Sequence, residues 1–374
     1  MIPVCTPWLP GNEKKYVQEC MDTNWISSSG KFIEKFEEDF SKYCGVEFGI
    51  SCTSCYGALH LACMAIGLKK GDEVIVPTFT MSAPLVAVIQ TGAKPVLVDC
   101  TKDTLNINEY AIEDKITENT KAIIAVHIYG HPCEMDKIME IARKHNLIVI
   151  EDAAEAHGAE YRGRKCGSIG DIGCFSFFGN KILTTGEGGM AITSNPEYAE
   201  KMRRFRNYAF QIPRFLHQDL GANYRLTNLQ AAIGVAQTEN VEMLVEARRN
   251  VGLRYNKLLD GVKGIILPRE RENCKNVYWM YGIILEDEVE ITREEFTSKL
   301  KKMGVDTREF FIPMNKQPVF LDGKLENAPN CNGDYLIADK VGKRGFYLPS
   351  SSNITDEQIE LVCYKIKELL NKSI

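Results

Sequence analysis

Residues 135–152 read MDKIMEIARKHNLIVIED, and this stretch joins a helical pattern directly to a strand pattern. Within 135–145, Ile138, Met139, Ile141 and Ala142 fall on one face at helical spacing, and basic residues fill the last turn. The run LIVI that follows is continuously apolar, which is typical of a strand buried on both faces. A helix leading into such a strand predicts an α/β fold with a mostly parallel sheet.

The same alternation of short β-branched runs and helical stretches extends through the first two thirds of the chain. It predicts a mostly parallel, seven-stranded sheet sandwiched by helices, with strands at 48–52, 73–77, 95–99, 122–126, 147–152, 174–178 and 190–194. After about residue 235 the pattern changes to a long charged helix, an alternating strand at 277–285, and a helix that begins at a capping box of Thr292 and Glu295. We therefore predict a large domain over 1–240 and a smaller C-terminal α+β domain over 241–374.

Composition restricts the class of protein. The 374 residues carry a formal charge of −5, so there is no electrostatic case for nucleic acid and no polybasic segment for a membrane surface. The apolar runs are too short to span a bilayer, and the first residues lack the layout of a signal peptide. Thirteen scattered cysteines indicate reduced thiols and a cytoplasmic location. Cys52 and Cys55 form a lone CxxC pair without a second pair at zinc spacing, so we expect no metal.

Three polar residues stand at the ends of neighbouring predicted strands, where α/β sheets bind ligands. Asp152 ends one strand, Ser176 lies in the next, and Lys181 follows it. Alone, Asp152 could be a helix N-cap, Ser176 could be satisfied by its strand neighbours, and Lys181 could cover apolar surface with its stem. Together, an amine, a carboxylate and a hydroxyl at one sheet edge predict a site for pyridoxal phosphate.

Longer motifs around these residues resemble a known family. EDAAEAHG (151–158), the lysine of FSFFGNK (175–181) and TTGEGGM (184–190) are similar to the DegT-type sugar aminotransferases, which are fold-type-I pyridoxal-phosphate enzymes acting on nucleotide-linked keto sugars. WISS, YGHPC and FFGNK most resemble the branch that makes GDP-perosamine from GDP-4-keto-6-deoxy-mannose. Further segments similar to the family follow in family order: 25–40, 71–80, 126–135 and 223–234.

The resemblance implies a role for each matching residue. Lys181 would hold the cofactor as a Schiff base and then move the proton between substrate carbons. Asp152 would pair with the pyridinium nitrogen, Glu155 would lie near the ring hydroxyl, and Ser176 would hold the phosphate. Asn223 would reach the phosphate of the neighbouring subunit, which implies a homodimer with shared active sites. The amino donor would be L-glutamate.

The sequence departs from the family pattern around the cofactor. Cys55 and Tyr56 stand where Gly-Thr commonly contacts the phosphate, which leaves open a contact through Tyr56 or a shift to Ser54 or Thr53. Met81 occupies a position where an aromatic ring usually stacks on the cofactor, and a thioether fixes a ring less firmly.

The residues predicted to bind substrate are more widely spread. Trp25, Ser27 and Ser28 of the WISS segment would close over the nucleotide sugar, and His131 would line the pocket unless its role is structural. Asn315 stands where many relatives have His. In the C-terminal domain, core packing explains Trp279 and Tyr281.

The predicted reaction is transamination of a 4-keto-6-deoxy sugar for surface-polysaccharide synthesis. Related dehydratases carry His in place of the lysine, so Lys181 argues against dehydration. Two alternatives remain open: the same chemistry on another nucleotide sugar or a small phosphorylated ketone, and a non-catalytic dimer that binds cofactor or nucleotide.

Overall fold

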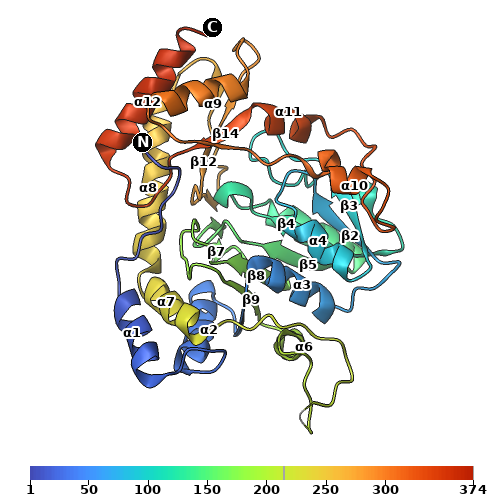
Figure 1. The fold of residues 1–374 in the computed structure, drawn as a ribbon. Helices are drawn as coiled ribbons and strands as arrows, with labels where there is room; N and C mark the ends of the chain where they lie inside the picture. Colours follow the sequence, from blue (N-terminus) through green and yellow to red (C-terminus); the bar gives the residue numbers. More distant parts are fainter. Residues whose placement is uncertain (214, 374) are drawn as a thin grey trace.

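A seven-stranded sheet forms the centre of the computed structural model, which describes residues 1–213 and 215–373 (Figure 1). The strand order is β1-β9-β8-β5-β4-β2-β3, and within the described residues β9 alone runs antiparallel to its neighbours. The predicted α/β class and mostly parallel seven-stranded sheet are confirmed. The strands are β1 (Phe48–Cys52), β2 (Glu73–Pro77), β3 (Lys94–Val98), β4 (Thr120–Val126), β5 (Ile148–Asp152), β8 (Ile172–Ser176) and β9 (Gly189–Thr193).

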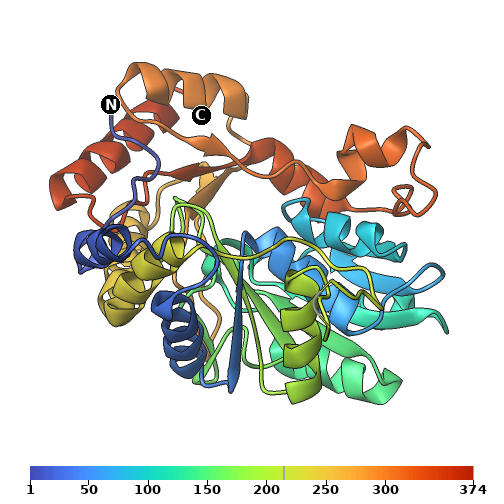
Figure 2. The same cartoon turned by 60° about the horizontal axis from the view of Figure 1, so that its bottom comes forward.

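Alternate residues of the central strands face different helices. Val74 and Val76 of β2 belong to a buried cluster that includes α3 (Cys55–Ala65) and α4 (Ala83–Gln90), whereas Ile75 packs in another cluster with α5 (Met135–His145). The rotated view shows helices on both sides of the sheet (Figure 2). Because both faces of the strand are covered, its sequence reads as a continuous apolar run.

The C-terminal part builds a four-stranded antiparallel sheet in the order β10-β12-β14-β13. Its strands are β10 (Ile265–Ile266), β12 (Tyr281–Leu285), β13 (Arg308–Glu309) and β14 (Gly345–Leu348). Long α8 (Val241–Leu259) runs between this sheet and α7 (Asn228–Glu239), and α9 (Arg293–Lys302) and α12 (Asp356–Leu370) lie near the chain ends (Figure 1). Thr292 and Glu295 form the predicted capping box of α9.

The remaining elements connect or cover these two sheets. A small sheet of β6 (Glu160–Tyr161), β7 (Arg164–Lys165) and β11 (Cys274–Lys275) joins the two parts of the chain. Other helices are α1 (Glu13–Thr23), α2 (Lys31–Cys44), α6 (Pro196–Arg206), α10 (Pro318–Leu321) and α11 (Leu336–Arg344), with 3-10 turns at Glu113–Lys115, Ile128–Gly130 and Met314–Lys316. No helix in the described part of the chain has the length and apolar character needed to cross a bilayer.

The predicted boundary between residues 1–240 and 241–374 falls at Asn240, between α7 and α8. Chain segments from both sides cross it. Ile2 bridges to Val305, and Phe310 packs in the buried cluster of the central sheet. The division into two domains stays a prediction.

Candidate active site

A pocket opens at the carboxyl ends of β5 and β8, beside the first turn of α3. The structure brings together here every cofactor residue predicted from the sequence except Asn223: Ser54, Cys55, Tyr56, Met81, Asp152, Glu155, Ser176 and Lys181. Trp279, Phe311 and Tyr347 from the C-terminal part close another side of the pocket. The pocket therefore lies between the two parts of the chain.

Lys181 reaches the pocket from the turn after β8. This strand ends at Ser176, two residues earlier than predicted, so Phe177 and Phe178 lie beyond it. The Lys181 side chain is only 10% exposed, with Nζ 3.7 Å from Glu155 Oε1 and 3.5 Å from the centroid of the Trp279 ring. Burial lowers the pKa of Lys181, and the Glu155 charge opposes that effect. Lys181 is thus a desolvated amine, not a surface lysine with a solvated head group.

Asp152 ends β5 with a buried carboxylate. Its Oδ1 accepts hydrogen bonds from Ala154 N at 3.1 Å and Cys55 Sγ at 3.7 Å, whereas Oδ2 accepts none from the residues that the structure describes. Burial raises the pKa of Asp152, and the Ala154 N–H and the Lys181 charge oppose it. Residues 153–158 form turns, so Asp152 caps no helix. One carboxylate oxygen is left to accept a group that enters the pocket.

Glu155 shares the buried end of the pocket with Lys181. Its Oε2 accepts a hydrogen bond from Tyr129 N at 2.7 Å. Burial raises the pKa of Glu155 to about 7, even though the Lys181 charge acts in the opposite direction. A carboxyl group titrating near neutrality beside a buried amine is suited to exchanging a proton with it.

The first turn of α3 also lines the pocket, next to Asp152. Ser54 is the N-cap, and its Oγ accepts from Gly57 N at 3.1 Å. A Cβ at Gly189 of β9 would lie 2.2 Å from the Ser54 carbonyl, which explains the glycine at this position. The first N–H groups of a helix have no intrahelical acceptor and attract anions. Together with the Ser176 hydroxyl, this turn offers donors for a phosphate.

Tyr56 and Met81 occupy the rim of the pocket. The Tyr56 ring stacks on His60 with centroids 6.0 Å apart, and His60 Nδ1 lies 3.0 Å from the Tyr224 hydroxyl. Met81 is 53% exposed, and its Sδ accepts from Ala83 N at 3.1 Å at the start of α4. The structure thus holds both unusual residues in the pocket lining.

Comparison with known proteins identifies the family. The family model of the DegT/DnrJ/EryC1/StrS aminotransferases matches residues 9–367. The chain belongs to this family. It is 45% identical over 99% of its length, and 98% of the relative's, to a GDP-perosamine synthase of Caulobacter vibrioides, and 40% identical over 98% of both chains to one of Escherichia coli O157:H7. The crystal structure of S. venezuelae DesV in complex with a ketimine intermediate superimposes with a TM-score of 0.89, at 32% identity over 96% of this chain and 94% of that one.

Membership confirms that this protein is an aminotransferase with the fold of that enzyme class, as the motifs around Lys181 predicted. Three residues predicted to contact substrate lie elsewhere in the single chain. Trp25, Ser27 and Ser28 are exposed in the loop before α2. Asn228 fixes this loop, donating from Nδ2 to Trp25 O at 2.7 Å and from N to Ser27 O at 2.6 Å.

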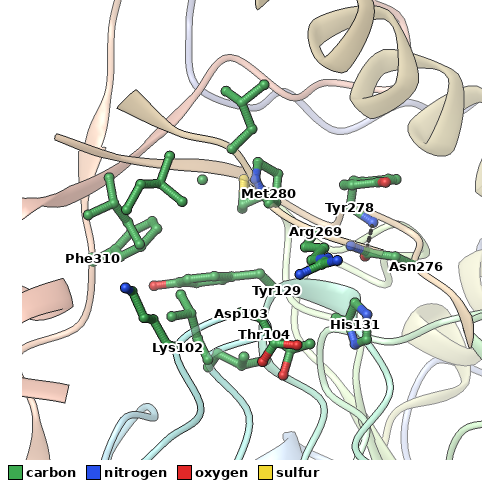
Figure 3. Close-up of a pocket in the computed structure, with 17 residues that line it drawn as sticks. Lys102, Asp103, Thr104, Tyr129, His131, Arg269, Asn276, Tyr278, Met280 and Phe310 are labelled. Carbon is green, nitrogen blue, oxygen red and sulfur yellow. Dashed lines mark hydrogen bonds between the residues drawn. The ribbon is translucent and has the colours of Figure 1, made fainter. Parts of the chain in front are cut away.

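His131 and Asn315 are buried but do not line the aminotransferase pocket. His131 borders a second cavity together with Arg269, Asn276 and Tyr278 (Figure 3). Its Nδ1 lies 2.7 Å from Pro132 O, and its Nε2 accepts from Arg271 N at 3.1 Å. Burial lowers the pKa of His131 to about 4. Asn315 donates from Nδ2 to Asp339 Oδ1 at 3.0 Å.

Asn223 is exposed in the segment between α6 and α7, which projects away from the rest of the chain (Figure 1). Its backbone bridges Asn207, so the local conformation is extended. Asn223 does not line the pocket of its own chain.

The sequence did not indicate the residues that the C-terminal part contributes. Tyr281 is buried in the core of that part, as predicted. Trp279 packs in the buried cluster of the central sheet and also lies on Lys181. Phe311 and Tyr347 also reach the pocket. Alternation along 277–285 gave no sign that Trp279 faces a pocket, because a core aromatic and a pocket aromatic follow the same pattern.

Proposed function

We propose that this aminotransferase uses pyridoxal phosphate to transfer an amino group from L-glutamate to a nucleotide-linked 4-keto-6-deoxy sugar of the GDP-4-keto-6-deoxy-mannose type. The observation that carries the proposal is the desolvated Lys181 amine in one pocket with Asp152 and Glu155. The relatives named GDP-perosamine synthase, at 45% and 40% identity over nearly the whole chain, support the sugar assignment. The product would supply surface-polysaccharide synthesis.

The residues present fit the cofactor. Asp152 Oδ2 is free to accept from a pyridinium N–H, and that cation would compensate the burial of the carboxylate. Elsewhere in the pocket lining, the α3 N–H groups, Ser54 and Ser176 would hold the phosphate. Bound pyridoxal phosphate supplies an electron sink for bond changes at the substrate carbon.

Lys181 would hold the cofactor aldehyde through Nζ and, once released, would carry a proton on the same atom. Its burial keeps bulk water away from Nζ, and Glu155 at 3.7 Å can accept or return a proton. Lys181 therefore has both functions in the proposed mechanism: attachment of the cofactor and proton transfer.

We also propose a homodimer with shared active sites. The segment between α6 and α7 exposes Ile212 by 96% and Leu220 by 91%, which favours a second copy of this chain as its covering partner. In such a dimer Asn223 would reach the partner's phosphate, and Trp25, Ser27 and Ser28 would close over the nucleotide sugar. The cytoplasmic location stays a prediction.

The test uses purified protein loaded with pyridoxal phosphate. We expect a visible absorbance band, fixation of the cofactor on Lys181 by borohydride, and loss of both in Lys181→Ala. Lys201 of α6, which is partly exposed and pairs with Glu197 rather than lining the pocket, is the matched control when changed to Ala. A Lys181→Ala protein that retained the band and turnover would contradict the proposal.

The acceptor is tested separately. The protein is first bleached with L-glutamate and then mixed with a panel of keto compounds. We expect colour to return with GDP-4-keto-6-deoxy-mannose. Return only with a small ketone phosphate would refute the sugar assignment, and no bleaching by glutamate would favour a non-catalytic binding protein.

A further inference from the structure

Trp279 lines the pocket and lies against the Lys181 amine, as Glu155 does. Its ring centroid lies 3.5 Å from Lys181 Nζ, and the residue is 3% exposed. The face of an indole ring attracts a cation, and the attraction is stronger where water is excluded. The Lys181 amine is therefore bounded by an aromatic face on one side and by a carboxylate on another.

Trp279 is itself held firmly. Its Nε1 donates to Asn180 O at 2.9 Å, so the ring is tied to the residue next to Lys181. Its carbonyl accepts from Nη1 of Arg248, a guanidinium that is 2% exposed. Within the described residues Arg248 makes no ion pair, and its other bonds go to Ser352 Oγ at 3.1 Å and Cys5 Sγ at 3.6 Å. The Arg248 guanidinium, whose burial without an opposite charge is unfavourable, therefore fixes the backbone of Trp279.

The two boundaries of the amine are also connected to each other. Trp279 stacks on Tyr129 at 6.3 Å and 26°, and Tyr129 N donates to Glu155 Oε2 at 2.7 Å. Glu155 Oε1 then lies 3.7 Å from Lys181 Nζ. Trp279, Tyr129, Glu155 and Lys181 therefore form a closed ring of contacts between the two parts of the chain.

We propose that Trp279 is a positioning residue that holds the Lys181 amine beside Glu155 whenever the amine is not bonded to the cofactor. The inference rests on the proposed function, because transamination requires Lys181 to be released and then to act again as a free amine. A released lysine side chain has four rotatable bonds, and misplacement by about 1 Å is enough to slow a proton transfer. The indole face limits where Nζ can go during that interval.

The first measurement uses protein without cofactor. Competitive acetylation with acetic anhydride, read by mass spectrometry, gives the reactivity of Lys181 relative to the exposed lysines. In Trp279→Leu, reactivity at Lys181 should rise about 5- to 30-fold, since the aromatic cover is gone. Trp279→Phe keeps an aromatic face and should stay within about threefold of wild type. Phe296→Leu, which alters the buried core of the C-terminal part, is the control for general destabilisation.

The second measurement follows glutamate-driven bleaching of the loaded enzyme. Trp279→Leu should lower the maximal rate about 10- to 100-fold while leaving the glutamate concentration for half-maximal rate within about twofold. The inference would be overturned if Trp279→Phe or Phe296→Leu lowered the maximal bleaching rate as much as Trp279→Leu does. It would also be overturned if Trp279→Leu changed neither the acetylation of Lys181 nor the bleaching. If wild type neither gains colour nor bleaches, the proposed function fails, whereas the acetylation comparison still tests Trp279.

Discussion

Replacing Glu155 with Gln should change how the stability of the cofactor-free protein depends on pH. Glu155 is buried at the closed end of the pocket, where Tyr129 N donates to it and Lys181 Nζ lies 3.7 Å away. Burial raises its pKa from 4.5 to about 7. Gln keeps a carbonyl acceptor for Tyr129 N and does not titrate, so it removes the Glu155 proton together with the charge that acts on Lys181.

The magnitude follows from the two pKa values. Between pH 4.5 and 7 the folded protein holds a proton that the unfolded chain has lost, so the free energy of unfolding falls as pH rises. At 1.36 kcal/mol per pH unit, this window corresponds to about 3 kcal/mol. The stabilisation is fully present below pH 4.5 and is lost as pH rises through about 7. Glu155→Gln lacks this loss. The free energy of unfolding of the variant minus that of wild type should therefore be about 3 kcal/mol larger at pH 8 than at low pH.

Urea unfolding at intervals from about pH 4.5 to 8, followed by circular dichroism, measures the difference between the two proteins. Asp152 also has a raised pKa and is present in both proteins, and its charge is one cause of the raised pKa of Glu155. Glu290→Gln, at an exposed glutamate, is the matched control and should parallel wild type. Parallel curves for wild type and Glu155→Gln would show that Glu155 does not carry a raised pKa in the folded state.

Three further predictions concern the pocket and its partner. Asp152→Asn should slow glutamate-driven bleaching about 10²- to 10³-fold without lowering the melting temperature, and an unchanged stopped-flow rate would argue against a pairing with the pyridinium nitrogen. Gly189→Ala places a methyl group 2.2 Å from the N-cap carbonyl of α3. It should lower the free energy of unfolding in urea by about 2–4 kcal/mol and release cofactor on dialysis. Gly179→Ala, where the nearest atom to the new methyl group is 3.9 Å away, is the control. Mixing inactive Lys181→Ala and Asn223→Ala dimers under exchange should restore about a quarter of wild-type activity, and no recovery would contradict shared sites.

The central sheet could be predicted because a strand that is buried on both faces has a continuous apolar run in the sequence. All seven central strands lie within two residues of the ranges expected from apolar runs. The error at 174–178 has a local cause. Phe177 and Phe178 continue the aromatic run, but β8 ends at Ser176, and Phe178 is 47% exposed beside the pocket. An apolar run does not show where the ladder of hydrogen bonds stops.

The C-terminal strand at 277–285 was predicted too long for a different reason. Only Tyr281–Leu285 form β12, and Tyr278 adopts a φ of 48°, which breaks the extended conformation. A bulky residue with positive φ has no signature in an alternating pattern. Trp279 follows this turn and lies on Lys181 in addition to packing in the core, and the alternating pattern indicated only the packing.

Site residues that follow neighbouring strands could be predicted from the sequence, whereas those from distant parts of the chain could not. Asp152, Ser176 and Lys181 follow neighbouring strands, and the topology of a parallel sheet brings them together. Tyr347 and Phe311 reach the same pocket from the far end of the chain, where no local pattern indicates proximity. Asn223 is exposed and does not line the pocket of its own chain, and its proposed role would require a second chain that one sequence does not describe.

The contacts between the first and last segments of the chain set the order in which the protein is completed during synthesis. Ile2 N donates to Gly304 O at 2.8 Å, and Ser350 N donates to Val4 O at 2.7 Å. Tyr347 of the pocket stands in the same late segment. Because a ribosome releases residues from the N-terminus onward, the first residues must wait for nearly the whole chain before they find their partners. The central sheet can form earlier, but the pocket lacks Tyr347 until β14 has emerged.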